Sequence, residues 1–548
     1  MENKENQKSI TKRKREKSSK KKKYEEINSE SLSDYESISE GDEDIVEEVE
    51  VEVEENENEN EINTNKPKEK DPNKIQVQIW DEKQNKNLIK NNEELDFDNN
   101  AYEMLHRSKV EWPCLSIDFL IPENFDKSNI KSFYLPNSER NLTKDKYPYT
   151  THMIAGSQTN EKNGYLYYMK WYGMYKTKYD DDPDKGFDSD DEEGKNPYMK
   201  YEKVKMNGNI NRIKSMKNSY ISAIWTDSPS IEIIDISELI TNINEQESIS
   251  IENENNMNTY PNIKKRKITQ KNTIIKSFPQ KKEGFALDWN NINPFTLASG
   301  GYDNTLNIYI PTNENISDII QLSQNNNKSN FLSELTGHKN SIEDIQWSPN
   351  QEYVIATCSI DKTIRFWDLR QNNNNSVLII ENAHDSDVNV ISWNNIRNNT
   401  IASGGDDNCF KVWDIRFFKD GPISNVKWHR NPINSLMWDP FEESQIVVSS
   451  EDDRLSIWDF SVEADEKKLF DNFNMEIPQQ LVFLHQGQKN LKDVKFHPYF
   501  KNLIVSTSEN GINLFKPGFE EDEDDEDDDL NDFGSGEERE DDMEIEES

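Results

Sequence analysis

The stretch GHKNSIEDIQWSPNQEYVIATCSIDKTIRFWDLR, residues 337–370, decides the fold because the chain repeats its pattern twice more. The second copy is AHDSDVNVISWNNIRNNTIASGGDDNCFKVWDIR, residues 383–416, and the third is WHRNPINSLMWDPFEESQIVVSSEDDRLSIWDF, residues 428–460. In each copy a His precedes an Asp by 23 residues, and a Trp follows that Asp six residues later. A fixed registry at a period of about 45 residues is typical of a repeat architecture.

Each copy predicts four short strands. In the first copy, apolar residues alternate over 342–347, a buried run follows at 354–358, and a turn containing Asp leads to a third strand at 364–367. This is the pattern of one propeller blade. Weaker copies, which bring the expected total to seven blades within residues 123–517, cover 152–172, 210–236, 284–310 and 490–515. We therefore predict an all-β, seven-bladed WD-repeat β-propeller.

A buried hydrogen-bond relay explains the fixed spacing, because a loop His, a turn Asp, a strand hydroxyl and an indole N–H can satisfy one another inside a blade. The expected members are His338, Asp361, Thr357 and Trp367 in the first copy, His384, Asp407, Ser403 and Trp413 in the second, and His429, Asp452 and Trp458 in the third. The third copy has Val448 where the hydroxyl belongs, which predicts an incomplete relay. A set that recurs at blade spacing and ends on Trp indicates structure and not a catalytic triad.

Charge is concentrated outside the repeats. The chain has 548 residues, is 32% hydrophobic and carries a net charge of −41. Three runs carry the excess of acids over bases: they hold 18 acids in Glu25–Glu61, 9 in Asp180–Glu193 and 19 in Glu520–Ser548. We expect residues 1–74 and 518–548 to be disordered and to attract basic proteins such as ribosomal proteins and histones, although the runs could serve solubility alone. Polyanionic runs repel phosphates, so no specific nucleic-acid contact is expected.

The N-terminus carries two basic clusters that are typical of nuclear import signals, with a phosphate-binding arm as the alternative. They comprise Lys12, Arg13, Lys14 and Arg15, and then Lys20, Lys21, Lys22 and Lys23. No apolar stretch predicts a signal peptide or a membrane span. The three cysteines form no C-x-x-C pair, so we expect no structural zinc, other metal or cofactor, and a reducing compartment.

The segments around the blades carry further predictions. Asn100 and Glu103 have the spacing of a capping box, which predicts a short helix within residues 75–122. The composition of Pro113–Leu120 predicts the N-terminal strand that completes the last blade. We expect the insertions at 176–205, 237–278 and 313–330 to be surface loops.

A specific resemblance begins at Glu111, Trp112, Pro113 and Leu115, where E-W-P-x-L precedes the first blade. This signature, and the segment IPQQLVFLHQGQKNLKDVKFHPYF before the seventh blade, resemble the histone-binding WD-repeat family. Within that family the chain is most similar to the glutamate-rich WD-repeat group of nucleolar ribosome-assembly chaperones, because HQG at His485–Gly487 replaces the H-x-G-H of histone binders. The resemblance spans roughly Ile75–Pro517.

The resemblance implies a monomeric nuclear and nucleolar chaperone that escorts a newly made basic ribosomal protein, large-subunit ribosomal protein L-three, into 60S pre-ribosomes with other assembly factors. It also implies a side groove for a partner helix, formed by the predicted helix and the insertion near 463–471. The groove residues would be Tyr102, Leu105, His106, Arg107, Asp465, Glu466, Asp471 and Phe473. The acids would pair with Lys or Arg, and an apolar anchor would supply most of the binding energy.

Two alternatives remain open, and both are binding functions. The chain could be a histone chaperone or a component of a chromatin complex. It could also be a substrate receptor of a cullin-based ubiquitin ligase, because Trp367–Arg370 and Trp413–Arg416 resemble the W-D-x-R boxes of such receptors. No phosphate-binding loop, metal-ligand cluster or activated nucleophile is recognisable, so we expect no enzymatic activity.

Overall fold

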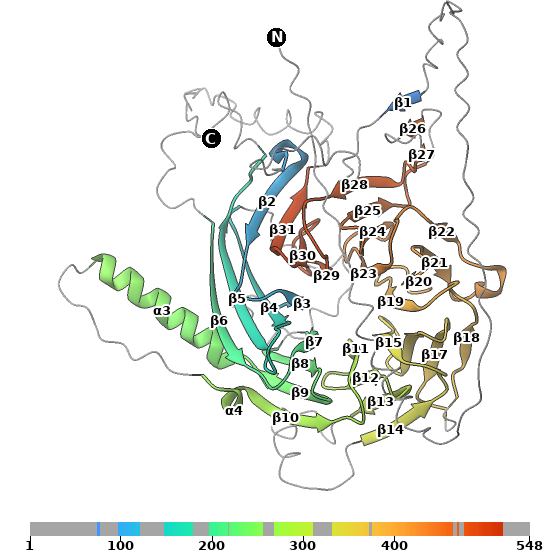
Figure 1. Ribbon diagram of the computed structural model, residues 1–548, viewed down its shortest axis with the longest axis horizontal. Helices are drawn as coiled ribbons and strands as arrows, with labels where there is room; N and C mark the ends of the chain where they lie inside the picture. The colour runs from blue at the N-terminus through green and yellow to red at the C-terminus, as the bar shows by residue number, and fades with distance from the viewer. Residues whose placement is uncertain are drawn as a thin grey trace, which may run out of the picture.

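The computed structural model describes residues 74–76, 97–120, 147–178, 197–217, 219–255, 268–310, 331–371, 375–463, 468–470 and 476–518. Within these ranges, seven four-stranded antiparallel sheets stand around one axis as the blades of a β-propeller (Figure 1). The all-β, seven-bladed fold class is confirmed. The predicted import signal and both acidic termini lie outside the described residues.

The first three blades take their strands in chain order, with the innermost strand first. They are blade one, β3 (Cys114–Phe119), β4 (Tyr149–Ser157), β5 (Tyr165–Met174) and β6 (Tyr198–Lys205); blade two, β7 (Ile210–Ser215), β8 (Ile221–Thr226), β9 (Ser230–Asp235) and β10 (Ile274–Pro279); and blade three, β11 (Gly284–Trp289), β12 (Leu297–Gly301), β13 (Thr305–Tyr309) and β14 (Phe331–Thr336).

The next three blades contain the repeats that decided the fold. They are blade four, β15 (Ile342–Trp347), β16 (Val354–Ser359), β17 (Ile364–Asp368) and β18 (Leu378–Ile380); blade five, β19 (Val388–Trp393), β20 (Thr400–Gly405), β21 (Phe410–Asp414) and β22 (Ser424–Val426); and blade six, β23 (Ile433–Trp438), β24 (Gln445–Ser450), β25 (Leu455–Asp459) and β28 (Leu481–His485). The strands predicted from the first repeat at 342–347, 354–358 and 364–367 lie within one or two residues of β15, β16 and β17.

Blade seven closes the ring by joining the two ends of the propeller. Its inner strands are β29 (Asp493–Phe496), β30 (Ile504–Ser508) and β31 (Gly511–Pro517), and its outer strand is β2 (Tyr102–Ser108) from the N-terminal side. β2 pairs antiparallel with β31 from Tyr102↔Pro517 to Ser108↔Ile512. Ring closure in this way removes exposed sheet edges.

Two predictions for the N-terminal segment were therefore wrong. Tyr102–Ser108 is a strand and not a helix, and only one 3-10 turn, η2 (Asn99–Ala101), precedes it. Pro113–Leu120 does not complete the last blade, because β3 within it is the innermost strand of blade one. The capping-box spacing predicted a helix, but this segment pairs with β31 instead. That pairing buries Tyr102, Met104 and Leu105 more completely than an isolated short helix could.

Two of the predicted surface loops also contain regular structure. The segment 176–205 ends in β6, and 237–278 contains the helix α3 (Ser237–Asn255), the short α4 (Gln270–Thr273) and most of β10. α3 projects past the outer edge of blade one (Figure 1). Its first turns pack Leu239 and Ile243 into the core between blades one and two. The insertion as a whole is polar, so the sequence did not indicate this contact with the core. The third predicted loop, 313–330, lies outside the described residues.

The hydrophobic core is divided among the interfaces between neighbouring blades. Blades four and five, for example, enclose Ile364, Phe366, Ile391 and Trp393. Glycines on second strands allow this packing: a Cβ added at Gly404 would lie 2.5 Å from the Ile433 side chain of the next blade. Outside the ring, a small sheet joins β1 (Lys74–Gln76), β26 (Lys468–Phe470) and β27 (Glu476–Ile477).

Candidate functional site

The predicted partner-binding segment 102–107 is mostly buried within blade seven and its border with blade one. The backbone N–H of Leu105 donates to Thr177 Oγ1 at 2.9 Å, and His106 Nε2 lies 3.1 Å from the Tyr175 carbonyl. Tyr102, Leu105 and His106 are at most 7% exposed, so they are not available to a partner helix in this conformation. Arg107, by contrast, is exposed, with its guanidinium carbon 4.8 Å from the centre of the Phe97 ring.

The other predicted groove residues, Asp465, Glu466, Asp471 and Phe473, lie outside the described residues. The strands around them can nevertheless be located. β26 and β27 form an inserted hairpin between β25 and β28 of blade six, and β26 pairs in parallel with β1 from the N-terminal side. The insertion therefore meets residues 74–76 of the N-terminal segment through strand pairing, whereas a groove between the insertion and residues 102–107 stays a prediction.

His485, which marks the HQG segment, is the last residue of β28 in blade six and is buried at the border with blade seven. Its ring stacks on Phe515 with centroids 4.3 Å apart and on Phe97 at 5.6 Å, and Nδ1 lies 2.7 Å from the Tyr102 hydroxyl. Burial lowers the pKa of His485 to about 3, against the opposing hydrogen bond of Gln488. The imidazole is therefore neutral at physiological pH, and its role is packing. Phe97, its stacking partner, was not predicted from the sequence.

The relays of blades four and five bring all their predicted members together. His338 Nδ1 lies 3.0 Å from Asp361 and its Nε2 lies 2.7 Å from Thr357 Oγ1, which accepts the Trp367 indole N–H at 2.9 Å. The corresponding distances among His384, Asp407, Ser403 and Trp413 are 3.0, 2.7 and 2.9 Å. Every ring nitrogen is in use, so neither His is available as a catalytic base.

The prediction of an incomplete relay in blade six was wrong. His429 Nδ1 lies 3.2 Å from Asp452, and its Nε2 lies 2.8 Å from the hydroxyl of Ser456, which also accepts the Trp458 indole N–H at 2.7 Å. Val448 on β24 and Ser456 on β25 are cross-strand partners. The hydroxyl of the relay is therefore supplied by the next strand outward and occupies the same place. Only the cross-strand register, which the sequence pattern did not give, could identify Ser456.

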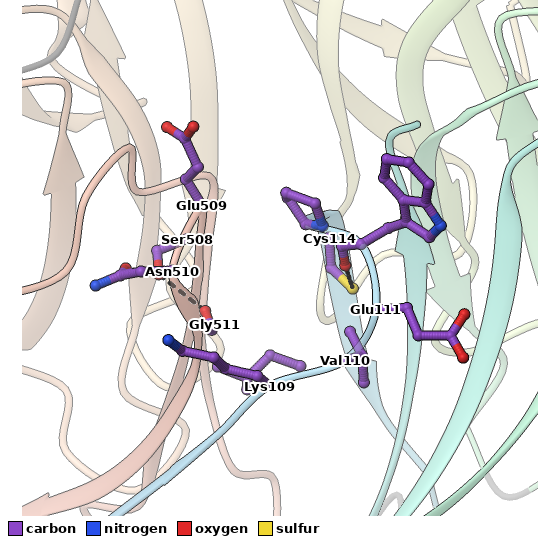
Figure 2. A pocket seen from close by; sticks show the side chains of 11 residues that line it. Lys109, Val110, Glu111, Cys114, Ser508, Glu509, Asn510 and Gly511 are labelled. Atoms are coloured by element: carbon purple, nitrogen blue, oxygen red, sulfur yellow. Dashed lines mark hydrogen bonds between the residues drawn. The ribbon is translucent and has the colours of Figure 1, made fainter. Parts of the chain in front are cut away.

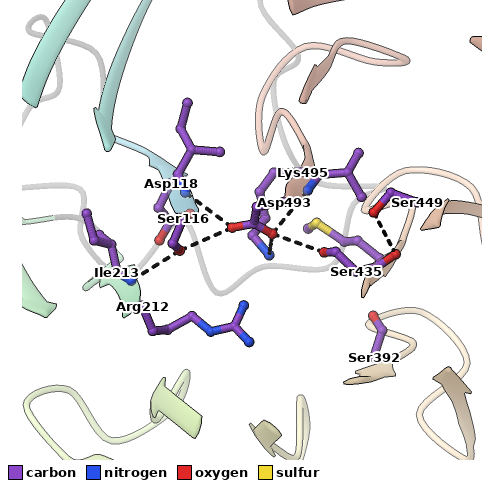
Figure 3. Close-up of polar contacts among 12 residues, drawn as sticks. Ser116, Asp118, Arg212, Ile213, Ser392, Ser435, Ser449, Asp493 and Lys495 are labelled. Atoms are coloured by element: carbon purple, nitrogen blue, oxygen red, sulfur yellow. Dashed lines mark hydrogen bonds and ion pairs between the residues drawn. The ribbon is translucent and has the colours of Figure 1, made fainter. Parts of the chain in front are cut away.

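Buried charges link the innermost strands around the axis (Figure 3). Asp493 on β29 accepts hydrogen bonds from Ser116 Oγ of blade one at 3.1 Å and from Ser435 Oγ of blade six at 3.0 Å, and Lys495 lies 3.2 Å away. Burial would raise the pKa of Asp493, but Lys495 and Arg212 outweigh it and the pKa falls. This carboxylate holds three blades together, which is a structural role.

A cavity of about 120 Å³ opens at the junction of blades seven and one (Figure 2). Figure 2 shows Glu509 and Asn510 on one wall, facing Val110 and Cys114 on the other. The E-W-P segment Glu111–Pro113 contributes to its lining, and Glu111 binds Lys203 of β6. Burial raises the pKa of the Cys114 thiol to about 12, so this thiol is protonated and unreactive. The cavity can receive a partner side chain but contains no activated nucleophile.

In each of the two W-D-x-R boxes, the arginine pairs with the aspartate of the same box. Arg370 makes two hydrogen bonds with Asp368, at 2.8 and 2.6 Å, and Arg416 repeats them with Asp414 at 2.9 and 2.5 Å. Each arginine therefore binds the carboxylate two residues before it.

Among the described residues, no group of acids, His and Cys is arranged to hold a metal ion. No helix in the described ranges is long and apolar enough to cross a membrane.

Comparisons with known proteins agree with this architecture. A family model described as the histone-binding protein RBBP4 or a component of the CAF1 complex matches residues 92–174, and the WD-domain repeat model matches 329–368, 375–414 and 421–459. The glutamate-rich WD repeat-containing protein 1 of Dictyostelium discoideum is 40% identical over 448 residues, which cover 78% of this chain and 83% of that protein. The chain belongs to the glutamate-rich WD-repeat-containing protein family. The resemblance inferred from the E-W-P-x-L and HQG segments is thereby confirmed.

Two further relatives cover an equal share of the chain. The ribosome assembly protein rrb1 of Schizosaccharomyces pombe is 31% identical over 445 residues, which cover 78% of this chain and 82% of that protein. The protein named HEAT STRESS TOLERANT DWD 1 of Arabidopsis thaliana is 32% identical over 463 residues, which cover 78% of this chain and 89% of that protein. Relatives from a fungus and a plant thus match more than three quarters of this chain.

Proposed function

We propose that this protein is a non-enzymatic ribosome biogenesis factor of the nucleus and nucleolus. It holds a newly made basic ribosomal protein, specifically large-subunit ribosomal protein L-three, until that protein joins the 60S pre-ribosome. The observation that carries the proposal is the similarity over 445 residues to a protein named for ribosome assembly. The acidic runs add a physical reason, since they speed the encounter with a Lys- and Arg-rich client.

The non-enzymatic part of the proposal follows from how the reactive side chains are used. The relay histidines are hydrogen-bonded on both ring nitrogens, His485 is stacked in a dry core, and the Asp493 carboxylate is shared among blades. The three cysteines, Cys114, Cys358 and Cys409, are buried free thiols, and burial raises the pKa of each. These groups stabilise a binding scaffold.

The client site, in this proposal, lies where the inserted hairpin meets the N-terminal segment beside blades six and seven. Asp465, Glu466 and Asp471 pair with basic residues of the client, Phe473 is the apolar anchor, and Arg107 lies at the rim. Tyr102, Leu105 and His106 position this surface from below, since all three are buried in blade seven. Rim charges of this kind affect association rate and specificity more than affinity.

Purification of the native protein at moderate salt, followed by mass spectrometry, tests the function. We expect one large-subunit ribosomal protein, L-three, in near-equal amount with the chain. A direct titration of purified L-three against the D465N/E466Q/D471N triple variant then tests the site: the association rate falls roughly tenfold and its salt dependence weakens. A matched triple, D385N/D406N/E381Q, removes the same charge from loops of blade five and leaves the rate within about twofold.

Histone binding is the second candidate, because the family model that matches residues 92–174 is described as a histone-binding protein. The same purification separates the two functions. Co-purification of histone H-four in near-equal amount, with L-three absent, contradicts the ribosomal proposal and supports the histone function. The ligase-receptor alternative rests on the two W-D-x-R boxes alone, and both arginines are held by their own Asp neighbours.

A further inference from the structure

The outer strand of blade one, β6, differs from the other outer strands of the ring. It reads YMKYEKVK, with Lys200, Lys203 and Lys205 interleaved with tyrosines. Among the described outer strands, each of the other six contains at most one Lys or Arg, and β18 and β22 contain none. β6 is the edge strand of its sheet, and of its residues only Val204 is buried; α3 lies beside it (Figure 1).

Aromatic rings and ammonium groups alternate across β5 and β6. Tyr172 and Tyr198 are cross-strand partners whose rings stack with centroids 4.6 Å apart, and Tyr198 is 50% exposed. Lys170 and Lys200 form the next cross-strand pair on the same face. Their ammonium nitrogens lie 4.7 and 5.9 Å from the centre of the Tyr172 ring. We name these four residues, together with Lys203 and Lys205, the Tyr–Lys edge.

Two like charges directly opposite each other destabilise a sheet unless something offsets their repulsion. The Tyr172 ring offsets part of it, and Lys170 donates to Asn244 of α3 at 3.3 Å. Glu202, two residues after Lys200 on the same strand, accepts a hydrogen bond from Gln246 at 2.7 Å, and Glu111 pairs with Lys203. The Tyr–Lys edge therefore has a net positive charge, and the exposed side chain of Tyr198 lies beside this charge. These two features suit a ligand in which an anionic group is attached to a planar ring.

We propose that the Tyr–Lys edge binds single-stranded RNA. Successive phosphates lie along Lys200, Lys203 and Lys205, and an unpaired base stacks on the exposed ring of Tyr198. Lys203 and Lys205 leave the opposite face of this edge strand from Lys200, so the nucleotide chain follows the edge itself. Stacking on tyrosine together with lysine contacts to the backbone is how sequence-tolerant binding of single strands is achieved. This activity is separate from client binding, because it uses the outer edge of blade one and not the surface beside blades six and seven.

The test uses the full chain and a fluorescein-labelled 15-nucleotide oligo(U) followed by fluorescence anisotropy over a salt series. K200A/K203A/K205A weakens binding at least tenfold and lowers the slope of log K against log salt by about 2. Y198A weakens binding about tenfold, and Y198F retains it because the stacking ring remains. The matched control, K276A/K281A/K282A, removes the same charge from β10 and its following loop in blade two and changes affinity less than twofold.

Cross-linking locates the bound strand directly. Oligo(U) carrying 5-iodouridine is irradiated with the full chain, and the cross-linked peptide is identified by mass spectrometry. A cross-link within 197–205 that is lost in Y198A supports the proposal. Cross-links confined to residues 12–23, or equal weakening by the β6 and β10 triple variants, would overturn it in favour of diffuse binding by the basic arm. The thermal unfolding temperature of each variant should lie within a few degrees of that of the parent, which excludes loss of the fold. Tyr198 is half exposed, so its replacement should not disturb the core.

Discussion

Blade four and blade seven are held together by different combinations of contacts. Blade four comes from one continuous segment and fixes its loop with a polar relay from His338 to Trp367. Blade seven is assembled from both ends of the propeller, and His485 at the end of β28 stacks on Phe97 and Phe515. Its ring nitrogens also lie 2.7 Å from the Tyr102 hydroxyl and 3.2 Å from Asn513 Nδ2. Closure between residues far apart in sequence therefore adds non-directional apolar burial to a smaller set of directional hydrogen bonds.

The largest effect is expected where the ring closes. Tyr102→Ala removes a buried ring that packs against Phe483 and Phe515, and should lower the free energy of unfolding by about 3–5 kcal/mol. Urea denaturation measures the loss. Tyr102→Phe keeps the ring and removes only the hydroxyl bonded to His485, which should cost about 1–2 kcal/mol. Equal costs for the two variants would show that closure depends on the hydrogen bond and not on apolar burial.

The pH dependence of stability should reveal the buried, neutral imidazole of His485. The pKa of His485 is about 3 in the folded state, below its ordinary value of 6.5, so its stabilising contribution is complete above pH 6.5 and declines as the pH falls toward 3. Between pH 6 and 4 the parent should therefore lose about 1 kcal/mol per pH unit more than His485→Phe. Parallel stability profiles for the two proteins would contradict a buried neutral imidazole.

Removal of the shared hydroxyl should weaken each relay to a similar extent. Thr357→Val in blade four and Ser456→Ala in blade six each leave the relay His Nε2 without a donor and the indole N–H without an acceptor, which should cost about 2–3 kcal/mol. Val448→Thr should give no gain, since Ser456 already fills the place. A stabilising Val448→Thr, or a neutral Ser456→Ala, would restore the incomplete relay that the sequence predicted.

The carboxylate of the relay carries a smaller, acid-sensitive contribution. Burial would raise the pKa of Asp407, but hydrogen bonding to His384 outweighs it and the pKa falls to about 2. A carboxyl with a depressed pKa stabilises the fold above its unfolded pKa and loses this contribution as the pH falls through the folded pKa. The stability difference between the parent and Asp407→Asn should be about 2 kcal/mol near pH 6 and should shrink between pH 4 and 2. A difference that is constant over this range would exclude the ionised carboxylate as its source.

The smallest effect is expected at the W-D-x-R boxes. Arg370 is 62% exposed, so Arg370→Ala should change the free energy of unfolding by less than about 0.5 kcal/mol, despite the close contact with Asp368. Arg365→Ala, which removes a half-buried arginine of β17, is the matched comparison. A cost above about 1 kcal/mol at Arg370 would assign the box a structural role that its exposure does not indicate.

The local pattern of the sequence determined much of this protein. The His-to-Asp spacing of 23 residues and the alternation over 342–347 identified three blades and two complete relays, and four weaker copies of the strand pattern gave the total of seven, because these patterns depend on neighbours within one short segment. The E-W-P-x-L and HQG segments identified the family for the same reason. The acidic runs and basic clusters were equally plain in the sequence.

Only the tertiary structure decided the contacts between distant segments. Tyr102–Ser108 has the local pattern of a helix, yet it is a strand because β31 offers unpaired hydrogen-bonding groups and an apolar surface more than 400 residues away. Ser456 replaces the hydroxyl that Val448 lacks because the two residues are cross-strand partners. The Tyr–Lys edge likewise arises because β5 and β6 place Lys170 beside Lys200 across an insertion. Pairing across such separations depends on register and burial, which no single stretch of sequence encodes.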